Sequence, residues 1–173
     1  KISQEKLNLA RLNLQAGKKA KLSVAYQAAK SYLTIGINLL SQDAWQTDYE
    51  LIYSLYYYGS EVAYLSGDFE LAESLYVEAL NRAQKSLDKA AIYRVQMTQY
   101  QLQGKNTEAI DIQRKSLQLL GWEMPTETEL IQVSFNEEIS TVEKFLEQHT
   151  VESILDFPPI QDSTIAEILR ILQ

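Results

Sequence analysis

A short sequence pattern occurs three times in the first two thirds of the chain, and it constrains the fold more than any other feature. In each copy, an apolar helical stretch is followed by a glycine, a polar corner and a second stretch that contains a spaced alanine. The glycines are Gly17, Gly67 and Gly104, and in the last two copies Ala72 and Ala109 follow five residues later. Because glycine permits tight turns and small residues let helices approach closely, the pattern predicts consecutive helical hairpins.

Apolar residues recur at intervals of three and four along most of the chain, and no convincing strand alternation is present. We predict helices over residues 3–16, 22–41, 44–66, 69–85, 88–103, 106–120, 127–149 and 163–173. Four polar residues stand where they would cap a helix: Thr47, Asp68, Asn106 and Thr126. The fold class expected is all-α, with about seven or eight helices in antiparallel pairs that stack into a right-handed superhelix.

The length of the chain and the spacing of the repeat pattern indicate how the domain is organised. A chain of 173 residues with 46% hydrophobic content is long enough for one continuous core. We expect helical repeats over 1–121 and, in the same domain, a truncated C-terminal helical extension over 122–173, where the repeat phase is lost. The absence of an initial methionine and of a C-terminal stop signal after the last helix suggests a fragment of a longer protein.

Composition excludes several classes of function. The chain has no cysteine, which removes disulfides and thiolate chemistry, and no apolar run approaches the roughly 18–20 residues of a membrane span. Net charge is −7, with basic residues concentrated in 1–30 and acidic residues in 121–173. An acidic chain of this kind is a poor nucleic-acid binder, because phosphate capture needs a basic face. We expect a cytoplasmic protein with neither a nucleic-acid nor a membrane partner.

No sequence motif indicates catalysis. The chain has no phosphate-binding loop, no dinucleotide fingerprint and no kinase catalytic motif, so we expect no catalytic residue and no cofactor in this segment. His149 is the single histidine and has no second ligand at helical spacing, so we expect a surface residue at a helix end and no metal site. The paired carboxylates have the spacing of solvated helix faces, as at Glu70/Glu73, Glu108/Asp111 and Glu137/Glu138.

Tyrosine is unusually frequent, with eleven residues, six of them between 49 and 64. Tyr49, Tyr53, Tyr56 and Ser60 form one helical stripe, which we interpret as packing between helices. The next stripe leads to a candidate interaction face, obtained from equal offsets to each corner glycine: Arg11, Tyr57, Glu61, Tyr64, Arg94 and Gln101. These residues either line a groove for an extended peptide or a neighbouring helix, or they belong to core or interdomain packing.

The hairpin pattern resembles tetratricopeptide (TPR) repeats, in which the first helix of each pair faces a concave binding surface. Residues 7–121 are also similar to the helical-repeat region of large bacterial signalling proteins, in four runs read together, within residues 10–20, 25–40, 45–51 and 61–73. In such proteins a serine/threonine kinase-like domain and an AAA or STAND-type ATPase precede the repeats, and GAF and sensor histidine kinase modules often follow. The catalytic residues of that family belong to domains outside this segment.

This resemblance implies a non-catalytic module for protein–protein interaction and signal relay, within a multidomain serine/threonine or histidine kinase that carries an ATPase module. Its partners would be the flanking kinase and ATPase domains of the parent chain, or a separate protein or peptide. A second hypothesis is a small-molecule sensor, with an inducer bound between the Tyr57/Tyr64 stripe and the neighbouring helix. An independent enzyme is the least favoured of the three alternatives.

Overall fold

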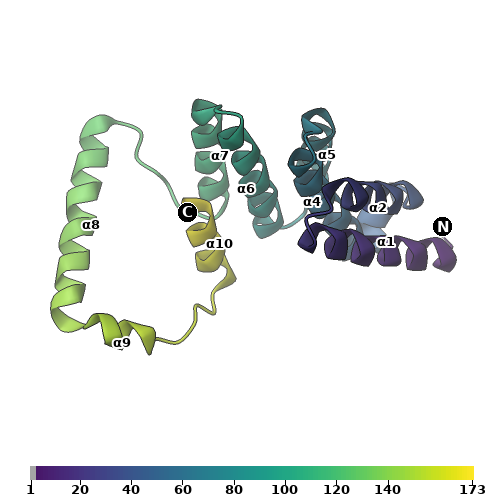
Figure 1. Ribbon diagram of the computed structural model, residues 1–173. Helices are drawn as coiled ribbons and strands as arrows, with labels where there is room; N and C mark the ends of the chain where they lie inside the picture. Colours follow the sequence, from purple (N-terminus) through teal and green to yellow (C-terminus); the bar gives the residue numbers. More distant parts are fainter. Residues whose placement is uncertain (1–2) are drawn as a thin grey trace.

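The computed structural model describes residues 3–173, apart from the side chains at 151 and 155, and all regular secondary structure in that range is helical (Figure 1). The prediction of an all-α fold is therefore confirmed. The helices are α1 (Gln4–Leu22), α2 (Tyr26–Leu39), α3 (Ala44–Thr47), α4 (Tyr49–Leu65), α5 (Phe69–Arg82), α6 (Ser86–Leu102), α7 (Asn106–Leu119), α8 (Thr128–Gln148), α9 (Val151–Leu155) and α10 (Ser163–Leu172).

Three helical hairpins form the body of the molecule. The pairs α1/α2, α4/α5 and α6/α7 each pack along their length, and each hairpin contacts the next through α2 with α4 and α5 with α6. Large apolar side chains fill the junctions, among them Trp45, Leu55, Tyr76 and Ile92. The buried residues form separate clusters along the row of helices: one joins α3, α4, α5 and α6, another joins α1, α2 and α4, and two smaller ones involve α6 and α7.

The three hairpin corners have the same backbone construction. Each has one residue with positive φ, namely Val24 (60°), Gly67 (83°) and Gly104 (72°). The next residue then donates its backbone N–H to a carbonyl five residues earlier, at 2.9 Å in all three corners. This is the Schellman arrangement that ends helices with a left-handed residue.

The corner predicted at Gly17 is wrong. Gly17 lies inside α1, which continues to Leu22, and a Cβ atom there would come within 2.5 Å of Leu33 Cγ on α2. The glycine therefore permits close helix packing, whereas Val24 makes the turn. The pattern missed this corner because valine rarely adopts the left-handed conformation.

With the first corner at Val24, an alanine follows the corner by five residues in all three hairpins. Five residues after each corner stand Ala29, Ala72 and Ala109, each fully or almost fully buried. A methyl side chain at these positions lets the second helix of a hairpin approach the first closely. Ala72 and Ala109 were predicted as contact points, and Ala29 completes the series.

Other boundaries differ from the predicted ones. The helix predicted over 44–66 is interrupted at Asp48, which separates α3 from α4, so Thr47 caps nothing. Thr126 does not cap α8, which starts after Glu127, and Asn106 lies inside α7. Asp68 does cap α5, because its carboxylate accepts a hydrogen bond from Leu71 N at 3.2 Å.

The C-terminal third leaves the body and returns. Helix α8 stands away from the hairpins in Figure 1, and none of its residues is buried. Helix α9 and an extended segment then lead back to α10, which packs against α6 and α7. There Ile171 is completely buried beside Ala90 and Leu117. No helix of the described residues is long and apolar enough to cross a membrane.

Candidate interaction face on α4, α6 and α10

Arg94 lies at the centre of the site that the structure assembles. It projects from α6, where its Nη2 donates to the Tyr57 hydroxyl on α4 at 3.3 Å and its Nε donates to Glu167 Oε1 on α10 at 2.8 Å. The structure thus brings together two of the six predicted face residues, Tyr57 and Arg94. Glu167, the third member, comes from 73 residues further along the chain.

Sequence reasoning missed Glu167. Its side chain is 7% exposed and its carboxylate also accepts a bond from Arg170 Nη1 at 3.1 Å. A buried carboxylate requires a cationic partner, and two guanidinium groups supply it here. A signal was present in the sequence, because Glu167 stands among apolar residues in the last helix, but its partner is not identifiable from local spacing. Burial acts to lower the pKa of Arg94, but the hydrogen bond that Arg94 donates to Glu167 and the nearby charges outweigh it, so this pKa is raised.

Tyrosine rings form a ladder along α4 that leads to Arg94. Tyr49 and Tyr53 stack with centroids 5.9 Å apart, and Tyr53 and Tyr57 stack at 6.2 Å. Tyr49 and Tyr53 donate from their hydroxyls to Asp88 on α6, at 2.6 Å to Oδ2 and 3.0 Å to the backbone oxygen. The predicted packing role of Tyr49 and Tyr53 is thus observed, and the ladder joins the second hairpin to the third.

Burial dominates the acid–base properties of these phenols. Burial first, and the Tyr49 hydrogen bond to Asp88 second, raise the pKa of Tyr49 to about 12. Burial also raises the pKa of Tyr53 well above its ordinary value, with a further contribution from the Asp88 charge. Groups held neutral in this way do not act as acids or bases near neutral pH, so their contribution is structural.

The remaining predicted face residues are dispersed. Tyr64 is only 9% exposed and belongs to the core around Tyr76, and burial raises its pKa to about 12. Glu61 pairs with Lys21 of α1. Gln101 is exposed in the last turn of α6, beside a cavity of about 240 Å³ between α6 and α7.

Arg11 does not occupy the position equivalent to Glu61, for which it was predicted. It pairs with Asp48 Oδ1 at 3.3 Å, near the junction of α3 and α4. Its assignment used Gly17 as a corner, whereas the offsets counted from Val24 give Leu14, Lys18 and Lys21 instead. Lys18 and Lys21 lie over the Tyr58 ring at 4.8 and 5.4 Å, so the first hairpin contributes cations to this side of the molecule.

One carboxylate departs from the prediction of solvated helix faces. Glu73 is partly buried and accepts hydrogen bonds from Gln99 Nε2 at 2.9 Å and from Gln96 Nε2 and the Tyr100 hydroxyl at 3.3 Å. It therefore joins α5 to α6. The other predicted carboxylates are exposed, namely Glu70, Glu108, Asp111, Glu137 and Glu138. Among the described residues, no three side chains of the metal-ligating acidic, histidine or cysteine types gather into a metal site.

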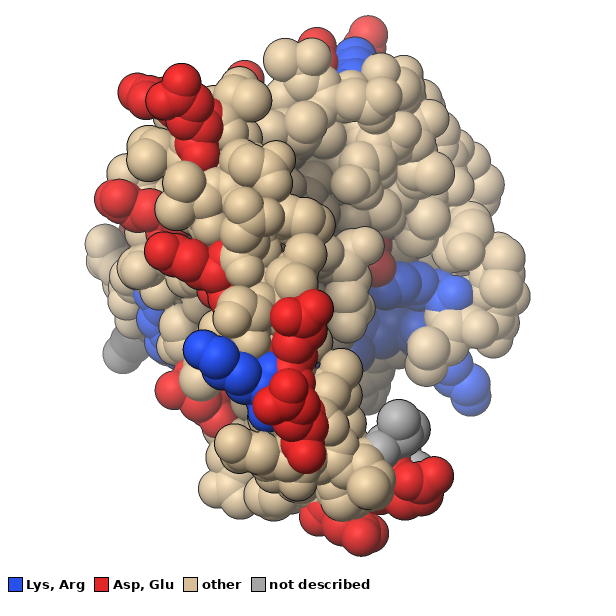
Figure 2. Space-filling model, turned by 90° about the vertical axis from the view of Figure 1, so that its left-hand side faces the viewer, with Lys and Arg blue, Asp and Glu red and all other residues tan. Residues whose placement is uncertain are grey.

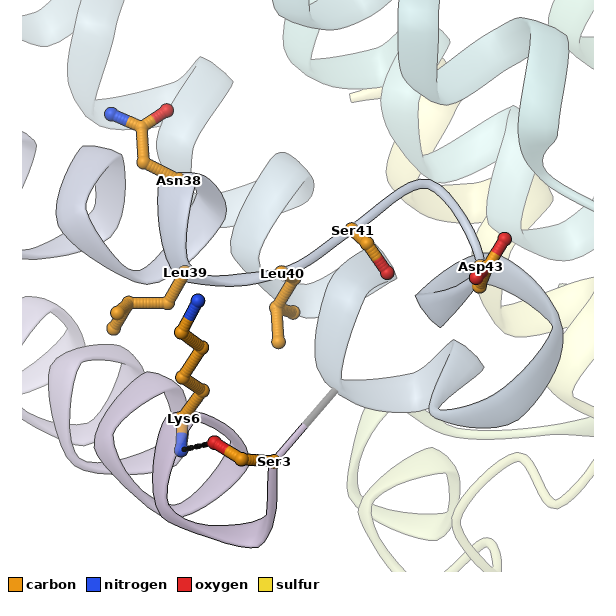
Figure 3. Close-up of a pocket in the computed structure, with 7 residues that line it drawn as sticks. All are labelled: Ser3, Lys6, Asn38, Leu39, Leu40, Ser41 and Asp43. Atoms are coloured by element: carbon orange, nitrogen blue, oxygen red, sulfur yellow. Dashed lines mark hydrogen bonds between the residues drawn. The ribbon is translucent and has the colours of Figure 1, made fainter. Parts of the chain in front are cut away.

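A cavity lies at the other end of the molecule. It measures about 470 Å³ and is lined by residues of α1, the end of α2 and the loop before α3. Figure 3 shows Lys6 extending from α1 toward Leu39 and Leu40, with Asp43 across the loop. The volume lies within the range of small-ligand sites, but Tyr57 and Tyr64 do not line this cavity.

The hybrid signal transduction histidine kinase G of Dictyostelium discoideum is 28% identical to this chain over 130 residues. The aligned segment is 70% of this chain and 4% of the relative, so the chain matches a small part of a much larger protein. No protein-family model matches the chain, and no solved structure matches it.

Proposed function

We propose that this chain is a TPR-like, non-catalytic module for protein–protein interaction and signal relay within a multidomain signalling kinase. The observation that carries the proposal is the docking of α10 on α6 and α7, where Arg94 holds Glu167. The hairpin body thereby receives a helix that is distant in sequence. A face that binds one helix within the chain has the shape and the polar anchor to bind another from a partner.

Two further observations support the proposal. The three hairpins share a corner geometry and a buried alanine five residues later, as expected for stacked repeats. The similarity to part of a histidine kinase agrees with a regulatory segment of a signalling protein. We call the surface of α6 and α7 on which α10 docks the α10 face. In such a protein, a partner that binds this face and displaces α10 would change the relative free energies of the conformations of the kinase, and so its activity.

The proposal is tested by supplying α10 in trans. The variant Ile171→Asp places a charge in a fully buried site and should release α10 from the body. A fluorescent peptide of residues 161–173 should then bind this variant at least tenfold more tightly than it binds the wild-type chain, whose own α10 blocks the face. Fluorescence anisotropy gives both dissociation constants.

The role of the polar anchor is tested in the released chain. Adding Arg94→Ala to Ile171→Asp should weaken peptide binding at least tenfold, because the buried carboxylate of Glu167 then lacks its main partner. Arg82→Ala, also added to Ile171→Asp, is the matched control, since Arg82 pairs with Glu78 on an exposed surface of its own helix. The four proteins compared are the wild type, Ile171→Asp, and Ile171→Asp combined with either Arg94→Ala or Arg82→Ala. Equal peptide affinities of all four would refute the proposal that α10 docks on an interaction face.

A small-molecule sensor is the second candidate, and the cavity beside Lys6 and Asp43 favours it. A metabolite that occupies this cavity would raise the melting temperature of the wild-type chain, because ligands stabilise the state that they bind. Lys6→Ala should abolish that increase and leave binding of the 161–173 peptide unchanged. Stabilisation by peptides or flanking domains, with none by metabolites, supports the interaction module.

A further inference from the structure

Helix α8 presents an apolar stripe that no part of the described chain covers. Its large side chains recur at helical spacing and are all exposed: Ile131, Phe135, Ile139, Val142 and Leu146. Phe135 alone is 58% exposed. A helix of 21 residues gains little stability from propensity and depends on packing of its apolar face. A stripe of this length on a soluble protein indicates a binding surface.

An aromatic cluster holds the C-terminal end of this stripe in a defined geometry. His149, the last residue of the helix region, stacks on Phe145 with ring centroids 4.3 Å apart. Phe157, beyond α9, meets both rings edge-on, at 6.0 Å from Phe145 and 5.4 Å from His149. His149 is thus at a helix end, as expected, but half-buried in aromatic contacts. These contacts fix the turn from α8 into α9 and extend the apolar surface.

Charge identifies the kind of occupant. Residues 127–156 contain eight carboxylates and one lysine. By helical spacing, Glu138 borders the stripe on one side and Glu143 on the other, whereas Lys144 lies on the opposite face of the helix. Figure 2, viewed from the α8 side, shows carboxylates on a largely uncharged surface, with basic side chains beside some of those near the centre. The apolar stripe is therefore bordered by negative charge alone.

We propose that the α8 stripe is a docking surface for a basic amphipathic helix of a partner protein. Leucine-type side chains of the partner would cover Phe135 and Val142, and its flanking Lys or Arg would face Glu138 and Glu143. Pairing of two copies through α8 would place carboxylates against each other, and an anionic membrane would be repelled for the same reason. This surface is separate from the α10 face, and the proposal does not depend on the proposed function.

The test uses the 173-residue chain and two synthetic 21-residue helical peptides. Both have leucine at heptad positions a and d; one has lysine and the other glutamate at the flanking positions. The lysine peptide should bind with a dissociation constant at least thirtyfold lower than the glutamate peptide, and its affinity should fall as salt is raised. Equal affinities for the two peptides would overturn the proposal.

Two matched pairs of variants locate the surface. Phe135→Ala with Val142→Ala, on the stripe, should weaken lysine-peptide binding at least tenfold. Leu130→Ala with Val133→Ala removes equally exposed apolar side chains from another face of α8 and should change binding less than twofold. Circular dichroism checks that the two double variants retain equal helix content; if both lower it, binding is compared again with the conservative pair Phe135→Leu and Val142→Thr.

The charge border is tested in the same way. Glu138→Gln with Glu143→Gln should weaken binding and reduce its salt dependence, whereas Glu137→Gln, on the side of Lys144, should not. Two further outcomes contradict the proposal. One is self-association of the wild-type chain that Phe135→Ala abolishes, measured by sedimentation, which would make a second copy the occupant. The other is binding to vesicles containing phosphatidylserine that depends on Phe135, which would indicate a lipid surface.

Discussion

Val24 gives the sharpest test of the corner geometry. Its φ of 60° is left-handed, a conformation that costs an L-residue about 1–2 kcal/mol. At the other two corners, glycine occupies the left-handed position. Val24→Gly removes this cost. Against it stand about 0.4–1 kcal/mol of extra unfolded-chain entropy for glycine and about 0.5 kcal/mol of lost burial, because the valine is 66% exposed.

Comparing Val24→Gly with a matched substitution, Val77→Gly, makes the test decisive. Val77 is similarly exposed but lies within helix α5, where glycine relieves no strain and costs about 0.5–1 kcal/mol. We expect Val24→Gly to be neutral or stabilising by up to about 0.5 kcal/mol, and Val77→Gly to destabilise by about 1 kcal/mol. The two free energies of unfolding should therefore differ by about 1–1.5 kcal/mol.

Urea titration followed by circular dichroism measures both values, provided that the slope of the transition is unchanged. Gly67→Val completes the set, because it introduces at the second corner the strain that Val24 carries at the first, and it should destabilise. Equal losses for Val24→Gly and Val77→Gly would refute the left-handed corner, and with it the repeat register counted from residue 24.

Three other substitutions and one binding measurement extend the tests. Ala72→Leu overfills a completely buried contact and should cost about 1–3 kcal/mol in the same urea assay; a variant as stable as the wild type would refute close packing there. Tyr64→Ala should lower the free energy of unfolding by about 3–5 kcal/mol, because the Tyr64 ring is in the core. A decrease below about 1 kcal/mol would instead indicate that Tyr64 lines the groove. The raised pKa of Tyr49 keeps its phenol protonated in the folded chain up to about pH 12, whereas the unfolded chain ionises above pH 10. Stability should therefore be fully present below pH 10 and fall toward pH 12, less steeply in Tyr49→Phe, as urea midpoints across that range will show. Calorimetry with ATP–magnesium and with zinc should give no saturable heat, and a micromolar dissociation constant for either would contradict the assignment of no cofactor.

Local patterns were sufficient for most helices of the body. The three- and four-residue apolar period located α5, α6 and α7 to within a few residues, and Ala72 and Ala109 were correctly assigned to close contacts. These features depend on neighbours in sequence, which is why periodicity reveals them. The first corner was misplaced because the sequence alone does not distinguish a glycine in a helix from a glycine in a turn. Gly17 permits close helix packing, and Val24 makes the turn.

The candidate site was predicted less well for a different physical reason. Tyr57 and Arg94 were placed on one face by counting from corner glycines, and they do meet. Glu167 completes the site from a helix whose position depends on the path of α8 and α9, and no local rule specifies that path. Tyr64 belongs to the core, which was one of the two alternatives for these residues, because an equal offset along neighbouring helices does not guarantee equal exposure when the helices cross at an angle.

The bond between Arg94 and Glu167 also has a kinetic consequence. Each hairpin joins residues close in sequence, and such contacts form quickly. With α7 already packed on α6, docking of α10 instead closes the 43-residue segment 120–162, for which the entropic cost is about 3 kcal/mol by the logarithmic law. The hairpins should therefore fold first and α10 should attach last. The same cost makes α10 the first part to detach under native conditions, so amide hydrogens of α10 should exchange with solvent well before those of α4 and α6, without unfolding of the body.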